Sequence, residues 1–230
     1  MSVTDSKTFE QLKLSEQAYE LIREDVLTGQ LFPSEKLSLD GLFKRYGIGK
    51  IPLREAMNRL SSEGLIERKG RRGFFVKSVS MTDLAELVKT RVWLETLALR
   101  ESIANGDKAW DEELVISHYH LSRIQIKVPQ DEGDKISKEW ETLHCAFHLA
   151  LLSRCGSQQL LSFCRNLMDQ AVRYRNLSLN STPRVRREEA AAEHEAILHA
   201  ALERKADQAC ELLKQHYQTT LDGLNNVIID

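Results

Sequence analysis

Glycine and proline are scarce in this chain. Its 230 residues include 11 Gly and 4 Pro, which is about half the share of an average globular protein. A chain with so few turn-forming residues is expected to consist mainly of long helices. Hydrophobic residues still make up 42% of the sequence, which is enough for a folded core and excludes a disordered chain.

Long apolar runs and paired cysteines are also absent. No run of 18 consecutive apolar residues occurs, so no membrane-spanning helix is expected. The first residues, MSVTDSKTFEQLKLSEQ, are polar and lack the apolar segment of a signal peptide. The four cysteines form no Cys-x-x-Cys pair, which favours buried free thiols over disulfides or a zinc ribbon. We therefore expect a cytoplasmic protein with no membrane partner.

The net charge of −2 hides an uneven distribution of charge. Residues 1–78 carry 14 basic and 11 acidic side chains, whereas residues 79–230 carry 18 and 23. Within the first part, residues 36–77 hold 11 basic and 4 acidic residues. A short basic segment attached to an acidic body is typical of a nucleic-acid-binding module joined to a second domain.

Residues 1–78 show the pattern of a winged helix-turn-helix. Helical spacing of apolar residues begins at Leu14, with Ser15 as the expected N-cap and Gly29 as the stop. A short helix ends at Gly47, and a third helix begins near Pro52 and ends before LIERK-GRRG-FFVKS. That last stretch predicts two short strands joined by a turn that glycines bound.

Residues 79–230 are predicted to form an all-α bundle of about six helices. The expected helices are 82–105, 111–126, 134–154, 157–179, 184–203 and 205–226. The expected loops are Asp107, Pro129–Gly133, Gly156 and Ser181–Pro183. The fold class is therefore mainly α, with the winged helix first and the bundle second.

Basic side chains mark the expected DNA-contacting surface. Lys50 and Arg54 lie four residues apart at the start of the third helix, opposite its apolar face. A recognition helix places such N-terminal residues against base edges in the major groove. The predicted DNA-binding residues are Lys44, Arg45, Lys50, Arg54, Arg59, Arg71, Arg72 and Gly73. The alternative for these charges is an ordinary solvated surface.

The same segment resembles the winged helix of the GntR family. The family pattern "GVSRTPVREAL..L..EGL" corresponds to GIGKIPLREAMNRLSSEGL, and the wing pattern "G..V" ends at Val76. Three departures are Ser34 in the Pro-Gly turn, the tripeptide Gly49-Lys50-Ile51 for Ser-Arg-Thr, and Asp40 near a position that often holds a base-contacting arginine. The resemblance implies DNA binding, whereas the operator sequence does not carry over.

Four histidines occupy apolar helix faces in the second part. His144 and His148 are spaced i, i+4, and His194 and His216 lie on the apolar faces of the last two predicted helices. Imidazoles that converge in a helix bundle form a metal site that suits zinc, nickel or copper. The alternative is four core histidines satisfied by hydrogen bonds. The remaining histidines, His118, His120 and His199, are interpreted as surface or packing residues.

The second part resembles the FCD effector domain of the FadR branch of GntR regulators. Its "D..FH" and "H..I..AI" patterns correspond to HCAFH and HEAILHA. The resemblance implies a divalent metal, zinc or nickel, held by His148, His194 and His216. His144 stands in the position of the family's aspartate, and Glu141 is a weaker candidate for a replacement carboxylate. Within this branch the chain looks most like the carbon-starvation-induced regulators.

The resemblance also implies a small carboxylic acid effector. Arg91 matches the arginine that lines the family's pocket, although it could instead pair with Glu95 at i, i+4. Arg173 and Arg175 are further candidates, and two residues apart they are not expected to face inward together.

These observations predict a regulator, most simply a repressor, that binds double-stranded operator DNA as a homodimer and senses a small carboxylate at a metal-containing pocket. One alternative is a DNA-binding dimer whose sensor domain is degenerate and metal-free. The other is a metal-dependent hydrolase, for which no general acid or base is evident: Glu193 and Glu195 flank His194 but are not expected to share its inward face.

Overall fold

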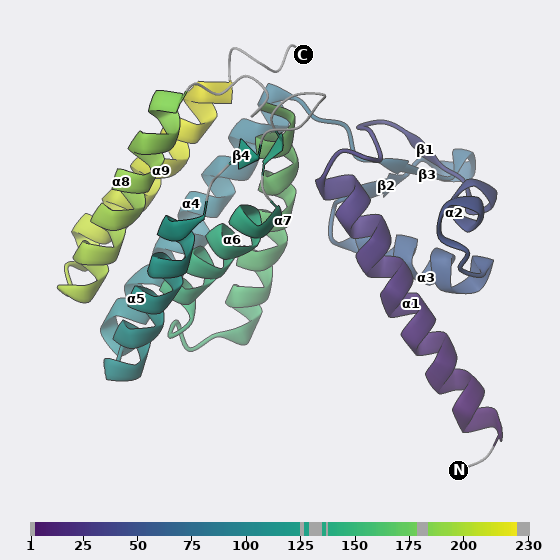
Figure 1. The fold of residues 1–230 in the computed structure, drawn as a ribbon, viewed down its shortest axis with the longest axis horizontal. Coiled ribbons are helices and arrows are strands. Elements are labelled where there is room, and N and C mark those ends of the chain that lie inside the picture. Colours follow the sequence, from purple (N-terminus) through teal and green to yellow (C-terminus); the bar gives the residue numbers. More distant parts are fainter. Residues whose placement is uncertain (1–2, 125–126, 129–134, 137, 179–183, 225–230) are drawn as a thin grey trace. The chain divides into compact units, whose positions relative to one another are not determined.

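The computed structural model describes residues 3–124, 127–128, 135–136, 138–178 and 184–224. The chain divides into two compact units, Met1–Val79 and Ser80–Asp230 (Figure 1). The division lies one residue after the boundary expected from the sequence. None of the described helices is both long and apolar enough to cross a membrane.

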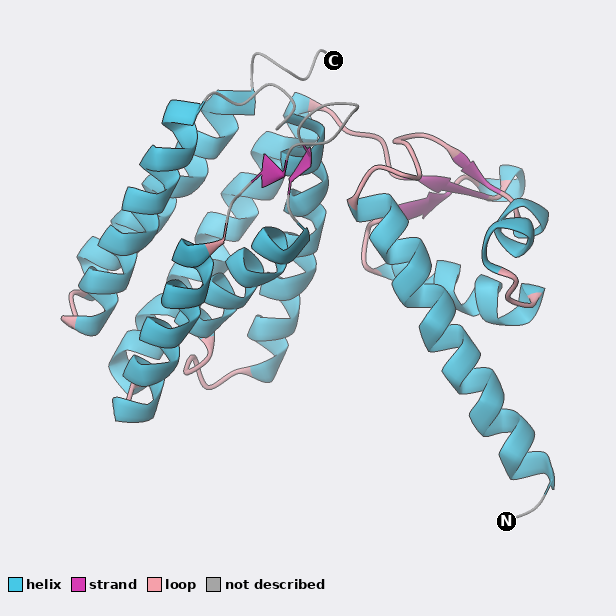
Figure 2. Ribbon diagram, in the orientation of Figure 1, coloured by secondary structure: helices cyan, strands magenta, loops and turns pink. Residues whose placement is uncertain are grey.

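The N-terminal unit contains three helices and a small sheet (Figure 2). In chain order the elements are α1 (Val3–Leu27), β1 (Lys36–Leu37), α2 (Leu39–Tyr46), α3 (Lys50–Ser62), β2 (Ile66–Arg68), the 3-10 turn η1 (Gly70–Arg72) and β3 (Phe74–Val76). The Ser38 side chain caps α2 by accepting from the Gly41 N–H, and Gly47 ends the helix at φ 70°. Glycine tolerates this left-handed backbone without steric cost.

The structure corrects two expectations in this unit. Ser15 is not an N-cap, because α1 already runs through it, and its hydroxyl instead donates to Glu55. The wing sheet has three strands in the order β1-β3-β2 rather than two. Lys36 of β1 pairs with Phe75, and Ile66 of β2 pairs with Val76. A strand of two residues is too short to show an alternating pattern in the sequence.

The core of the N-terminal unit lies between α1, α3 and the sheet. Its fully buried side chains include Ile22, Leu53, Met57, Leu60 and Leu65. These residues fix α3 by its apolar face, so the opposite face of the helix is turned to solvent.

The C-terminal unit is a bundle of long helices (Figure 1). The helices are α4 (Met81–Asn105), α5 (Lys108–Arg123), α6 (Lys138–Leu152), α7 (Gln158–Ser178), α8 (Arg184–Leu202) and α9 (Ala206–Leu224). The helix expected from residue 134 begins at Lys138, because Lys135–Ile136 forms strand β5, which pairs with β4 (Lys127–Val128). The helix expected over 111–126 runs from Lys108 to Arg123, where Asp107 caps its first turn. The loops expected at 129–133 and 181–183 fall outside the described residues.

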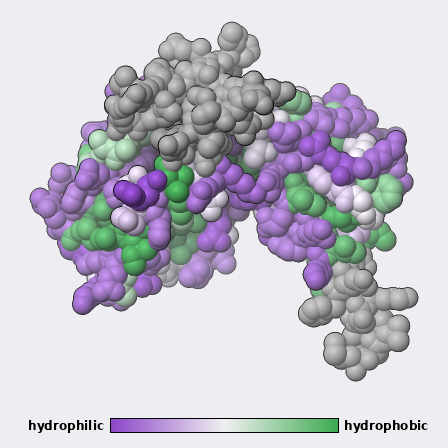
Figure 3. Space-filling view, in the orientation of Figure 1, coloured by the Kyte–Doolittle hydropathy of each residue, from purple (hydrophilic) through white to green (hydrophobic). Residues whose placement is uncertain are grey.

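Trp110 joins α5 to α6 at the centre of this bundle. Its ring is fully buried, and its Nε1 donates to the Ala150 carbonyl at 2.8 Å. The opposite side of α5 exposes Val115, Ile116 and Tyr119. Figure 3 shows hydrophobic surface over α5 and α6 on the face in view.

Candidate metal centre and nucleic-acid interface

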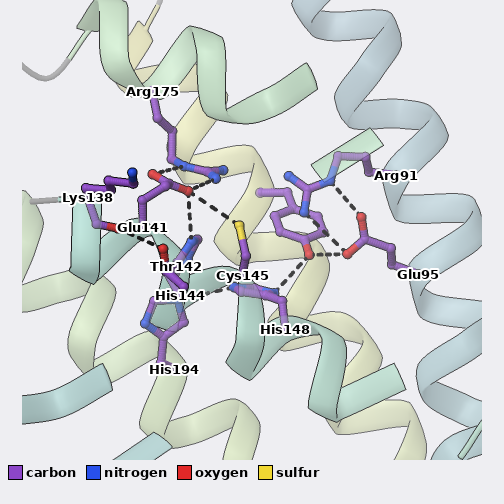
Figure 4. A network of polar contacts seen from close by, with 11 residues as sticks. Arg91, Glu95, Lys138, Glu141, Thr142, His144, Cys145, His148, Arg175 and His194 are labelled. Carbon is purple, nitrogen blue, oxygen red and sulfur yellow. Dashed lines mark hydrogen bonds and ion pairs between the residues drawn. The ribbon is translucent and has the colours of Figure 1, made fainter. Parts of the chain in front are cut away.

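Four histidines from three helices lie together inside the C-terminal unit. His144 and His148 come from α6, His194 from α8 and His216 from α9. Each is at most 5% exposed, and one nitrogen of each lies within 4.8 Å of one nitrogen of every other. The Nε2 atoms of His148 and His194 are 3.4 Å apart. The structure therefore brings together the four histidines that the sequence singled out. Figure 4 shows three of them, His144, His148 and His194.

Hydrogen bonds fix the tautomer of two of these histidines. The Nδ1 of His216 lies 2.7 Å from the Glu193 carboxylate, which accepts only, so the proton sits on Nδ1. The Tyr217 hydroxyl donates its single proton to Glu95 at 2.5 Å and can only accept from His148 Nδ1 at 3.1 Å. Both rings therefore carry the proton on Nδ1 and leave the Nε2 lone pair for a ligand.

Burial disfavours the charged form of His144, His148 and His194. It lowers the pKa of His144 to about 4, against the opposing effect of Glu141. Burial and the neighbouring histidines hold the pKa of His148 and His194 well below the usual value. Metals bind the neutral form of imidazole, so the lowered pKa of these three histidines favours metal binding.

The residues present fit a divalent transition metal. The donor set is four imidazoles, which suit zinc, nickel and copper and are poor ligands for magnesium or calcium. His144 also has a buried Nδ1 that forms no hydrogen bond among the described residues. A buried ring nitrogen without a hydrogen bond is rare in folded proteins and calls for an explanation.

Arg91 forms the intrahelical pair with Glu95 that the sequence left open. Its Nε lies 2.6 Å from Glu95 Oε1, and its guanidinium stacks over the Tyr217 ring at 4.1 Å. Both members of the pair are buried, at 4% and 0% exposure. Because Tyr217 also contacts His148, Arg91 is connected to the histidine cluster through Glu95 and Tyr217 (Figure 4).

Arg173 and Arg175 are both inside the unit, contrary to the expectation that they could not face inward together. Arg175 forms an ion pair with Glu141 beside His144 (Figure 4). Arg173 is 3% exposed and lies in the electrostatic field of Asp83 and Tyr174. Helix α7 packs against both α4 and α6, so two of its faces are covered. Of these two arginines, Arg175 is the one beside the cluster.

Sequence reasoning missed two contacts of the histidine cluster. Glu193 reaches His216 although it precedes His194 in the chain, which corrects the expectation that it faces elsewhere. Glu195 does lie outside, with an exposed side chain near His199. Tyr217 gave no signal, because its partners Glu95 and His148 come from other helices. Only the packing of α4, α6, α8 and α9 reveals these contacts.

The predicted DNA-contacting cations fall into two groups. Arg54 projects from the exposed face of α3, and Arg71 and Arg72 lie at the exposed turn η1; within the described part of the chain these three form no ion pair. Lys44 is also exposed. Gly73 closes the turn at φ 98°, which favours glycine.

The other predicted cations already have acidic partners. Lys50 lies 2.6 Å from Asp40, and Arg45 lies 2.7 Å from Asp25. Arg59 pairs with Glu16 at 2.8 Å and with Glu63 at 3.2 Å, and it stacks 3.6 Å over the Tyr19 ring. Lys50 and Arg59 thus link α3 to α2 and α1, and Arg45 links α2 to α1.

Comparisons with known proteins match both units. The model of bacterial regulatory proteins of the gntR family matches residues 14–76, and the FCD domain model matches residues 86–219. The transcriptional regulator BphR of Paraburkholderia xenovorans (strain LB400) is 32% identical over 209 residues, covering 90% of this chain and 84% of BphR. The transcriptional repressor GlaR of Escherichia coli (strain K12) is 32% identical over 205 residues, covering 88% of this chain and 92% of GlaR.

Solved structures support the same fold. E. coli McbR/YncC superposes with a TM-score of 0.75 at 20% identity, covering 93% of this chain and 97% of that one. A GntR-type regulator from Rhodococcus sp. RHA1 gives a TM-score of 0.72 at 16% identity, covering 94% and 99%. The curated relatives are transcriptional regulators rather than enzymes, which decides against the hydrolase alternative. The chain belongs to the GntR family of transcriptional regulators and carries an FCD domain.

Proposed function

We propose that this regulator represses transcription and that a small carboxylate, bound at a metal held by His144, His148, His194 and His216, controls its affinity for operator DNA. The observation that carries the proposal is the buried histidine cluster inside the FCD domain. When bound, a divalent cation would supply positive charge and a coordination position for a carboxylate oxygen.

The charges around the cluster favour an anionic ligand. Glu95, Glu141 and Glu193 lie beside the histidines, and Arg91 and Arg175 pair with the first two. The three carboxylates exceed the two guanidinium groups by one negative charge. A divalent cation would turn this into one net positive charge, and a monocarboxylate would neutralise it. Arg91 and Arg175 are the arginines we assign to the effector pocket, with Arg173 outside it.

In the N-terminal unit, we assign DNA contact to the exposed basic side chains. Arg54 on α3 would read base edges, and Arg71 and Arg72 at the wing turn would contact phosphate or a neighbouring groove, with Gly73 shaping the turn. Lys44 would contact the backbone of the DNA. Arg45, Lys50 and Arg59 would need to exchange their acidic partners for phosphate, so we expect them to contribute less.

We further propose that two copies bind a pseudo-palindromic operator and that the effector shifts the population of DNA-competent dimers. Relatives named as repressors, such as GlaR, support the direction of control. Exposed apolar side chains on α4 (Trp93, Leu97) and α5 (Ile116, Tyr119) provide surface for such an assembly.

The test begins with metal content. Plasma mass spectrometry of tag-free protein prepared without chelators is expected to find about one divalent metal per chain, followed by a thermal-shift screen of carboxylic acids. His148→Ala should lose the metal and the effector response but keep DNA binding. His199→Ala is the matched control, since His199 is exposed on α8. A metal content near zero that persists after exchange with zinc or nickel would instead favour the dimer with a metal-free sensor.

A further inference from the structure

Four histidines bring no negative charge to a metal centre. Two of the other three histidines have a carboxylate outside the cluster: His216 directs Nδ1 at Glu193, and His148 reaches Glu95 through Tyr217. Such carboxylates orient the ring and make the coordinating nitrogen more basic. His144 differs, because its buried Nδ1 has no hydrogen bond within the described residues.

The nearest carboxylate to that nitrogen belongs to Glu141, one turn earlier on α6. Glu141 Oε1 lies 3.8 Å from His144 Nδ1, which is just beyond hydrogen-bonding distance. The glutamate side chain is 12% exposed and is held by Arg175 from α7. A carboxylate has about four lone-pair directions, so Glu141 can accept from His144 without releasing Arg175.

We propose that Glu141 is a positioning residue of the metal centre: it accepts the Nδ1 proton of His144, turns Nε2 toward the other three histidines, and supplies the negative charge that His144 lacks. This inference rests on the proposed metal binding. Since the carboxylate acts through the imidazole, Glu141 need not coordinate the metal. With a histidine at position 144, the affinity for the metal is therefore expected to depend on Glu141. With a carboxylate at position 144, it is not.

The competing explanation is that Glu141 serves only to neutralise Arg175. A double-mutant cycle separates the two roles. His144→Asp places a carboxylate inside the cluster and removes the imidazole Nδ1 proton. If Glu141 acts through His144, its replacement by Gln matters only while His144 is present. If Glu141 only neutralises Arg175, Glu141→Gln lowers the metal affinity by the same factor with His144 and with Asp at position 144.

The experiment is a titration of the full-length, chelator-treated protein with Zn²⁺ and with Co²⁺, whose visible spectrum reports the ligand geometry. Glu141→Gln is expected to weaken Zn²⁺ binding by about 10- to 100-fold and to change the Co²⁺ spectrum. In the His144→Asp background, Glu141→Gln is expected to weaken Zn²⁺ binding by less than about threefold. Glu139→Gln is the matched control, because Glu139 is exposed on the same helix.

A second variant guards against misfolding. Glu141→Gln combined with Arg175→Gln removes both charges of the ion pair, so no buried cation is left without a partner. This double variant should still show the weakened Zn²⁺ binding. Unchanged affinity in Glu141→Gln, or an equal loss in both backgrounds, would overturn the role of Glu141. Failure of the unaltered chain to bind Zn²⁺ or Co²⁺ at all would overturn the proposed metal site itself.

Discussion

The two units of this regulator differ in the solvent exposure of their charged side chains. In the N-terminal unit the cations proposed to contact DNA are exposed. Lys50 and Asp40, for example, pair with side chains 58% and 78% exposed. In the C-terminal unit Arg91 and Glu95 pair with side chains 5% and 0% exposed. Exposed charges are screened by water and salt, whereas buried charges are screened much less and interact more strongly with their neighbours. The first arrangement suits a long polyanion, and the second suits one small anion.

The titratable groups follow the same division. All seven histidines of the chain lie after residue 117, so the N-terminal unit has none. The DNA-contacting residues proposed for the N-terminal unit are arginines and lysines instead. In the C-terminal unit, burial lowers the pKa of His144, His148 and His194. A change of pH or of metal is therefore expected to act on one unit and leave the other intact.

The largest effect is expected from Arg54. Arg54→Ala should abolish specific operator binding, a fall of about 1000-fold to the level of nonspecific DNA binding, while circular dichroism stays unchanged. The affinity is measured by fluorescence anisotropy, with an operator that has been selected from random DNA. Asn58→Ala, one turn further along the exposed face of α3, is the control. Operator affinity that survives in Arg54→Ala would refute α3 as the recognition helix.

Lowering the pH should destabilise the metal-free C-terminal unit alone. The unfolded chain protonates His144 near pH 6.5, whereas the folded chain does so only near pH 4. Between these values the unfolded state binds more protons, so the free energy of unfolding decreases as the pH decreases, by about 3 kcal/mol at pH 4 from this residue. All three tryptophans (Trp93, Trp110 and Trp140) belong to this unit, so tryptophan fluorescence during urea unfolding reports it selectively.

The control for this pH effect is His144→Asn, which should flatten the dependence in part. His199→Ala, at an exposed position, should leave the dependence unchanged. A free energy of unfolding that stays constant from pH 7 to pH 4 would show that the cluster is not held neutral by burial.

Matched tyrosine substitutions compare the units directly. Tyr217 and Tyr46 each donate to a carboxylate, Glu95 at 2.5 Å and Asp25 at 2.6 Å, but only Tyr217 is fully enclosed. Tyr217→Phe leaves Glu95 and His148 without this partner and should cost about 2 kcal/mol of stability. Tyr46→Phe should cost less than about 1 kcal/mol, because water replaces the lost bond. Urea unfolding followed by far-UV circular dichroism measures both changes. An equal decrease in the free energy of unfolding for the two variants would contradict the proposed difference between the units.

The smallest expected effect comes from Arg59. Because this side chain pairs with Glu16 and Glu63 and stacks on Tyr19, Arg59→Ala should lower the stability of the N-terminal unit by about 1 kcal/mol. Its effect on operator affinity should be well below that of Arg54→Ala. A loss of DNA binding as large as that of Arg54→Ala, with stability unchanged, would identify Arg59 as a direct DNA contact instead.

Periodicity predicted much of this molecule. The apolar faces of α3, α6, α8 and α9 could be predicted because apolar residues recur every three to four positions. On α6, α8 and α9 that pattern placed four histidines on inward faces. Strand β1 could not be predicted, because two residues are too few to show a hydrophobic periodicity. Its partner also lies far along the chain, since Lys36 pairs with Phe75. Glu193 and Tyr217 were missed for a similar reason: their partners come from other helices. The prediction that Arg173 and Arg175 could not both face inward was wrong. The sequence of α7 alone does not show that α4 and α6 cover two of its faces.

The order of elements along the chain has a consequence for synthesis. The DNA-binding unit is complete at β3, which ends at Val76, whereas the last histidine of the cluster is His216 on α9, about 140 residues later. At typical rates of translation this separation corresponds to roughly 10 s or more. Each newly made molecule can thus fold its DNA-binding unit before its sensor exists. A chain truncated before α9 would contain the DNA-binding unit but not the complete histidine cluster.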